Sequence, residues 1–143
     1  KAGNFSGNLL LCFFIIIWCS DVGAFAFGIS LGKIFPQKLF PSVSPKKTWI
    51  GFIGGLVSSV LAAFALYEFG ILKFPLIHCL ILSLIMSVTG VYGDLFESQW
   101  KRVYGVKDSG KIIPGHGGFL DRFDSTLMAM PFGAIYLAIF DLL

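Results

Sequence analysis

Residues 93–125 read GDLFESQWKRVYGVKDSGKIIPGHGGFLDRFDS and form the polar centre of an otherwise apolar chain. This stretch holds five of the eight carboxylates and five of the eleven Lys and Arg residues. Five of its polar side chains are spaced at i, i+3, i+4, i+7 and i+8, so they share one face of a helix. They are Asp94, Glu97, Ser98, Lys101 and Arg102. Asp121, Asp124 and Ser125 repeat the first three of these spacings. The stretch therefore predicts two short helical segments, each with a polar face.

A glycine-rich segment, GKIIPGHGG at residues 110–118, joins the two polar faces. Its glycines permit positive φ angles and close approach of backbone N–H groups to a ligand. Paired carboxylates beside cations and such a turn predict a metal-bridged phosphate site. The alternative is an ordinary solvated loop next to the membrane.

The overall composition is that of a membrane protein. Of 143 residues, 56% are hydrophobic and only 13% are charged, and the mean hydropathy is +0.83. We expect a single membrane-embedded catalytic domain over residues 1–143, the C-terminal part of a longer chain, because the sequence opens on Lys1. Nucleic-acid binding is excluded because no extended basic surface is available. The three cysteines lack metal-site spacing and lie in apolar runs, which predicts that they face lipid or pack inside the protein.

The hydropathy pattern predicts an all-α polytopic helix bundle with about four transmembrane spans. The predicted spans are 9–31, 49–72, 74–92 and 127–142, the last one continuous with the helix that carries Asp121 and kinked at Pro131. Glycine pairs at 28 and 32, and at 51 and 55, predict close helix contacts. His78, at the entrance to the third span, is expected to be a packing residue.

Asp21 is an acid near the middle of the first predicted span. A charge at that depth costs about 2.5–3.5 kcal/mol on insertion scales, so the side chain should face protein or water rather than lipid. A functional group and a hydrogen-bonded packing residue both satisfy this condition.

The segment between the first two spans, residues 32–48, is predicted to be a polar loop with four lysines. Lys46 and Lys47 follow Pro45 at the expected start of a helix, where Ser44 could cap. This arrangement suits a phosphate-binding site. A basic loop touching lipid headgroups is the alternative.

The positive charges also predict an orientation. The loop before Trp49 and the segment after Tyr92 are both basic, whereas Lys73 is the one cation in the link between spans two and three. By the positive-inside rule, both basic segments face the cytoplasm, where nucleotides are available. Asp94 and Asp121 lie where spans meet that face, and carboxylates near substrate phosphates are typical Mg²⁺ ligands.

These residues resemble the signature of the phosphatidate cytidylyltransferases, also called CDP-diacylglycerol synthases. The matching positions read Ser98-x-x-Lys101-Arg102-x-x-x-x-Lys107-Asp108-x-Gly110-x-x-x-Pro114-x-His116-Gly117-Gly118-x-x-Asp121-Arg122-x-Asp124. Ser44-Pro45-Lys46-Lys47-Thr48 is similar to a second motif of the family, and Asp21-x-Gly23-Ala24 to a third.

The resemblance implies transfer of CMP from CTP to phosphatidic acid by a homodimer in the bilayer. It also implies Mg²⁺ as the metal cofactor, with or without a second metal ion. It implies that Asp94 and Asp121 hold the metal. The implied catalytic residues are Asp94, Lys101, Arg102, Asp121 and Asp124. The implied substrate-binding residues are Ser44, Lys46, Lys47, Ser98, Lys107, Asp108, His116, Gly117, Gly118 and Arg122.

The reaction requires no strong general base, because the attacking phosphate oxygen is already an anion. His116 is therefore expected to contact phosphate or order its loop. Two positions depart from the family pattern: Ile50 stands where an acid is usual, and Val22 where a small hydroxyl residue is frequent. Two other functions are weighed: a non-catalytic transporter or lipid-phosphate binder, and a CDP-alcohol phosphotransferase, whose acidic motif is absent.

Overall fold

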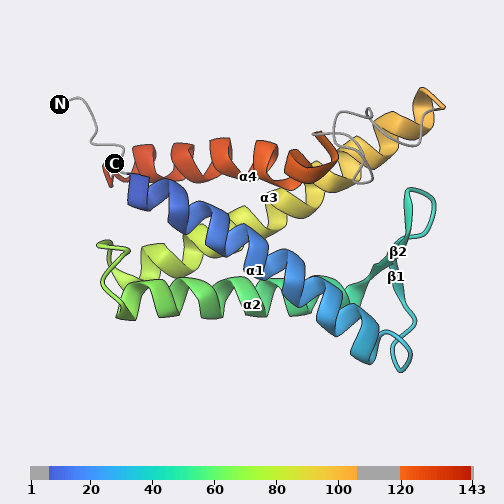
Figure 1. The fold of residues 1–143 in the computed structure, drawn as a ribbon, viewed down its shortest axis with the longest axis horizontal. Helices are drawn as coiled ribbons and strands as arrows, with labels where there is room; N and C mark the ends of the chain where they lie inside the picture. Colours follow the sequence, from blue (N-terminus) through green and yellow to red (C-terminus); the bar gives the residue numbers. More distant parts are fainter. Residues whose placement is uncertain (1–6, 106–119, 143) are drawn as a thin grey trace.

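The structure is a computed structural model that describes residues 7–105 and 120–142, without the side chains of residues 120–123. The described part is a helix bundle with a small β-hairpin at one end (Figure 1). In chain order the elements are α1 (Gly7–Leu31), β1 (Lys38–Phe40), β2 (Ser44–Thr48), α2 (Trp49–Glu68), α3 (Leu76–Val103) and α4 (Leu120–Ile139).

The predicted membrane helix bundle is confirmed. Three helices, α1, α2 and α3, are long and apolar enough to cross a membrane. The apolar part of α4, Asp124–Ile139, is shorter. As expected, α4 continues back through Asp121 without a break, and Pro131 lies inside it.

Glycines bring α1 and α2 into backbone contact. A Cβ added at Gly51 would lie 2.9 Å from the carbonyl oxygen of Ala24, and one at Gly55 would lie 3.0 Å from that of Ser20. The predicted contact through Gly51 and Gly55 is therefore confirmed. In the other pair, Gly28 faces the backbone of Gly51, but the atoms nearest to Gly32 belong to its own helix.

The apolar core lies at the end of the bundle away from the hairpin. Its largest fully buried side chains are Phe13, Ile16, Ile17, Leu82, Met86 and Leu137. His78 packs beside them, with Nδ1 2.9 Å from the hydroxyl of Tyr136, in the packing role that the sequence predicts. Cys12 and Cys79 are free and buried, as expected for packing residues.

The segment before α2 differs from the prediction. Residues 38–48 form an antiparallel hairpin, in which Lys38 pairs with Thr48 and Phe40 with Ser44. Ser44 begins β2 and does not cap a helix. Thr48 is the N-cap of α2, because its hydroxyl accepts a hydrogen bond of 3.2 Å from the Gly51 N–H.

The third helix also differs from the prediction. The sequence predicts a span that ends near Tyr92, with a short polar helical face in the segment after it. In the structure both belong to α3, which runs unbroken to Val103. The polar face from Asp94 to Arg102 is thus a rigid continuation of a membrane-crossing helix.

Candidate functional site

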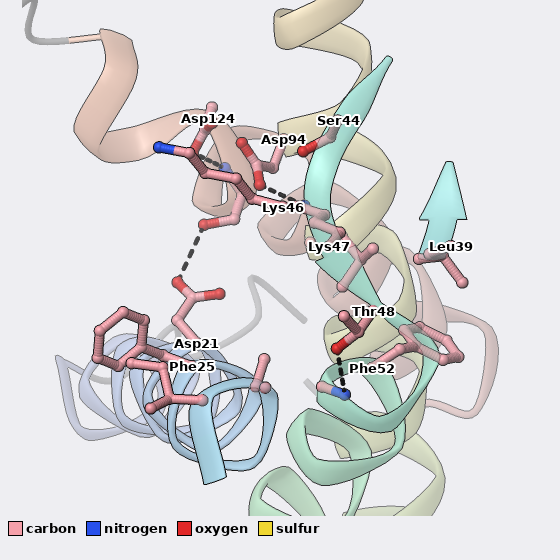
Figure 2. A pocket seen from close by; sticks show the side chains of 17 residues that line it. Asp21, Phe25, Leu39, Ser44, Lys46, Lys47, Thr48, Phe52, Asp94 and Asp124 are labelled. Atoms are coloured by element: carbon pink, nitrogen blue, oxygen red, sulfur yellow. Dashed lines mark hydrogen bonds and ion pairs between the residues drawn. The ribbon is translucent and has the colours of Figure 1, made fainter. Parts of the chain in front are cut away.

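A cavity of about 650 Å³ lies between α1, the hairpin and the facing parts of α2, α3 and α4 (Figure 2). Part of its wall is apolar, including Phe25 and Ile29 of α1 and Phe52 of α2. The rest is polar and charged, and consists of Asp21, Ser44, Lys46, Lys47, Thr48, Asp94, Asp124 and Ser125. One cavity therefore offers both a charged region and an apolar surface.

Two carboxyl groups from different helices meet in this cavity. Asp94 of α3 and Asp124 of α4 both line the cavity, and their carboxyl groups lie near enough to influence each other. The Ser125 N–H donates to Asp124 Oδ1 at 2.6 Å. Gly93 permits the close approach of α4, because a Cβ there would lie 2.8 Å from the Asp124 carbonyl oxygen. Two adjacent carboxylates repel each other unless a proton or a cation lies nearby.

The hairpin supplies the positive charge. Lys47 Nζ forms an ion pair with Asp94 Oδ2, and both side chains are partly buried. Ser44 and Lys46 come from the same strand and line the same cavity (Figure 2). The structure thus brings together the two segments, 44–48 and 93–125, that the sequence predicts to meet.

Asp21 faces the cavity from α1. Its Oδ2 accepts a hydrogen bond of 3.4 Å from the hydroxyl of Ser125. The side chain therefore faces protein and cavity, as expected for an acid inside a span. Asp21 is not among the residues that the sequence predicts for the site, although an isolated acid in an apolar span is a usable signal. Thr48, Phe25 and Phe52 were also missed, because neither hydroxyl nor aromatic residues are distinctive in a membrane protein.

The other predicted residues on α3 lie outside the described cavity wall. Lys101 Nζ is 2.7 Å from Glu97 Oε1, and that carboxylate is about nine-tenths buried. Arg102 Nη1 donates a 2.9 Å hydrogen bond to the carbonyl oxygen of Ser42, in the hairpin turn. Neither Ser98 nor these two cations is among the described cavity-lining residues.

Several predicted site residues fall outside the described residues. These are Lys107, Asp108, His116, Gly117 and Gly118. Asp121 and Arg122 lie in the first turn of α4, but their side chains are not described. Their roles stay predictions.

The donor set fits a hard divalent cation. Carboxylate oxygens from Asp94 and Asp124 are the ligand type that Mg²⁺ prefers. The described side chains contain no group of three His, Cys, Asp or Glu residues that could hold a metal. Asp121, the second predicted ligand, lies three residues before Asp124 on the same helix.

Residues 3–140 match the sequence model of the cytidylyltransferase family, and the chain belongs to that family. It is 50% identical over 126 residues to the phosphatidate cytidylyltransferase of Bacillus subtilis (strain 168), covering 88% of this chain and 46% of that protein. It is 45% identical over 124 residues to the phosphatidate cytidylyltransferase of Staphylococcus saprophyticus and 47% over 124 residues to that of Staphylococcus aureus (strain COL). Each of those two matches covers 87% of this chain and 46% of the relative. The chain thus spans about half the length of the curated relatives it matches.

Proposed function

We propose that this chain is the catalytic domain of a phosphatidate cytidylyltransferase. It would transfer CMP from CTP to phosphatidic acid and form CDP-diacylglycerol and pyrophosphate. The observation that carries the proposal is the mixed cavity, in which Lys47, Asp94 and Asp124 face the same space as an apolar wall. A nucleotide triphosphate needs the charged part, and a lipid needs the apolar part.

The reaction is an in-line displacement at phosphorus. A phosphate oxygen of phosphatidic acid attacks the α-phosphorus of CTP. The bond from that phosphorus to the oxygen bridging to the β-phosphate breaks, and pyrophosphate leaves with the electron pair. Since the nucleophile is already an anion, the protein needs mainly to position the two substrates and neutralise their charge.

The residues of the cavity suit these two tasks. Lys46 and Lys47 lie on β2 at the cavity, where their ammonium groups can contact the phosphates. Asp94 and Asp121 would hold Mg²⁺, with Asp124 beside them. Binding of a second metal ion is also part of the proposal. When bound, the ion supplies charge neutralisation at the phosphates and fixes their orientation. Phe25 and Ile29 form an apolar wall for the glycerol backbone and the start of the acyl chains.

The surroundings of the site are also part of the proposal. The positive-inside rule supports a cavity that faces the cytoplasm, the compartment that supplies CTP. The resemblance supports a homodimer. Lys107, Asp108, Arg122 and the loop of His116, Gly117 and Gly118 would complete the substrate contacts.

The test is release of pyrophosphate from CTP by the purified protein in lipid vesicles with phosphatidic acid and Mg²⁺. We expect turnover that requires all three, that stops on chelation of the metal, and that is abolished in Asp121→Asn while membrane insertion is retained. Binding of phosphatidic acid without pyrophosphate release would instead indicate a lipid-phosphate binder or transporter. Consumption of CDP-diacylglycerol with an alcohol, but not of CTP, would indicate a phosphotransferase.

A further inference from the structure

The hairpin that carries Lys46 and Lys47 is attached to α3 at two separate points. Near its base, Lys47 forms an ion pair with Asp94. At its turn, the carbonyl oxygen of Ser42 accepts the 2.9 Å hydrogen bond from Arg102. Asp94 and Arg102 are two helical turns apart, about 12 Å along the axis of α3. The hairpin therefore extends beside the outer part of that helix, at the right of Figure 1.

The hairpin has little means of holding this position alone. Its strands, Lys38–Phe40 and Ser44–Thr48, are short, and their pairing is irregular between the two ends. A two-stranded hairpin of this size is marginally stable in isolation. Most of its side chains are exposed or half-buried, so few apolar contacts fix it. Polar attachments such as those to α3 therefore help to hold it in place.

Arg102 is well suited to such an attachment. Its guanidinium stays charged at all physiological pH values and carries several donors in a fixed plane. In the structure it is directed to the hairpin turn, and it is not among the described residues that line the cavity. The family resemblance implies a catalytic role at this position, and the observed contact is with a backbone carbonyl 60 residues earlier in the chain.

We propose that Arg102 is a positioning residue, which holds the hairpin turn at Ser42 against α3 so that Lys46 and Lys47 face the cavity. The proposal rests on the cytidylyltransferase function proposed above. Among the described contacts with α3, removing the guanidinium leaves only the ion pair near the hairpin base. Lys46 and Lys47 would then face the cavity for a smaller fraction of the time. Substrate binding weakens more than the chemical step.

The first experiment compares Arg102→Ala with Val103→Ala, an exposed neighbour that serves as the matched control. For Arg102→Ala we expect KM for CTP to rise about tenfold, the usual scale for one lost positioning contact, with a smaller change in kcat. Val103→Ala should keep wild-type kinetics. Wild-type kinetics in Arg102→Ala would contradict the proposal.

The second experiment separates positioning from a direct phosphate contact. In the double variant Ser42→Cys, Arg102→Cys, a thiol cross-linker about as long as an arginine side chain replaces the lost attachment. We expect a KM about tenfold raised before cross-linking and near the wild-type value afterwards. The two single variants, Ser42→Cys and Arg102→Cys, keep the same three native cysteines as the double variant and, treated identically, should show no recovery of KM. A direct phosphate contact predicts no recovery in the cross-linked protein. Failure of the two thiols to cross-link would also contradict the proposal.

A third readout does not depend on activity. Trypsin should cleave after Lys46 and Lys47 faster when the hairpin moves away from its support. Arg102→Ala should be cut there several-fold faster than the wild type, and Val103→Ala at the wild-type rate. An inactive wild type would overturn the proposed function and leave this comparison intact. An active wild type with equal cleavage rates in all three proteins would overturn the positioning role alone.

Discussion

The two ends of the helix bundle are built in different ways. At the end away from the hairpin, Phe13, Leu82 and Leu137 are almost completely buried in an apolar core. At the other end, the same helices surround a cavity that contains Asp94 and Asp124. The polar hairpin covers part of the cavity end. The opposite end is instead filled by close-packed apolar side chains.

The difference indicates where stability and function lie. The packed end buries apolar surface between helices and fixes how they are arranged. The open end holds charged groups whose mutual repulsion and loss of hydration cost stability. Changes to the charged groups at the open end should therefore reduce activity with little loss of folding stability. Changes at the packed end should do the opposite.

The largest effect is expected for Asp94→Asn. The substitution keeps the size of the side chain but removes the charge that pairs with Lys47 and would hold the metal. We expect pyrophosphate release to fall about a thousandfold, the scale for loss of one group that stabilises a charged transition state. The variant should insert and elute like the wild type. Activity within a few-fold of the wild type would remove Asp94 from the site.

A smaller loss is expected for Lys47→Gln. The side chain loses its ion pair with Asp94 and its proposed contact with phosphate. Steady-state kinetics should show kcat/KM reduced about a hundredfold, with Lys47→Arg retaining more because it keeps the charge. Lys73→Gln, in the link at the other end, is the control and should change nothing. Equal losses at both positions would contradict the assignment of the open end as the site.

A packing change at the open end should have an intermediate effect. Gly93→Ala would place a Cβ 2.8 Å from both the Asp124 carbonyl oxygen and the Met128 side chain, so α3 and α4 must separate. Overpacking of this kind costs about 1–3 kcal/mol. We expect a lower unfolding temperature and activity reduced about tenfold, because the acid pair is pushed apart.

The control for that change lies one turn earlier on the same helix. At Gly90 the nearest atom to an added Cβ is 3.6 Å away, an ordinary contact. Gly90→Ala should therefore remain active and stable. If the two alanine variants behave alike, the close approach of α3 and α4 at Gly93 does not control the site.

The smallest effect is expected at the packed end. Tyr136→Phe removes the hydroxyl that is hydrogen-bonded to His78. Hydrogen bonds within membrane helix bundles contribute about 0.6 kcal/mol on average, so thermal unfolding should shift only slightly. Turnover at low temperature should equal that of the wild type. A marked loss of turnover would mean that the two ends are coupled.

Much of the architecture followed from the sequence. Apolar runs of bilayer length correctly predicted three membrane-crossing helices among the described residues, whereas the apolar part of α4, predicted as a fourth span, is shorter. As predicted, α4 includes Asp121. The acids of residues 93–125 and the lysines of 44–48 were expected to meet, and Lys47 does pair with Asp94. These predictions succeeded because the bilayer restricts both the length of each helix and the side on which charges can lie.

The hairpin could not be predicted in the same way. Ser44-Pro45-Lys46-Lys47-Thr48 has a low preference for strands, and its strand form depends on contacts with distant residues. For the same reason the N-cap was assigned to Ser44 rather than Thr48, since the capping role depends on where the hairpin ends. The bond between Arg102 and Ser42 joins positions far apart in sequence, and no local pattern indicates it.

The uninterrupted course of α3 from Leu76 to Val103 has a mechanical consequence. Asp94 and Arg102 lie on one continuous helix, so both move together when α3 tilts in a thinner or thicker hydrocarbon layer. The hairpin, held at both points, would follow that tilt, and its separation from the acid would be preserved. We expect turnover to vary little across vesicles whose lipids differ in acyl-chain length.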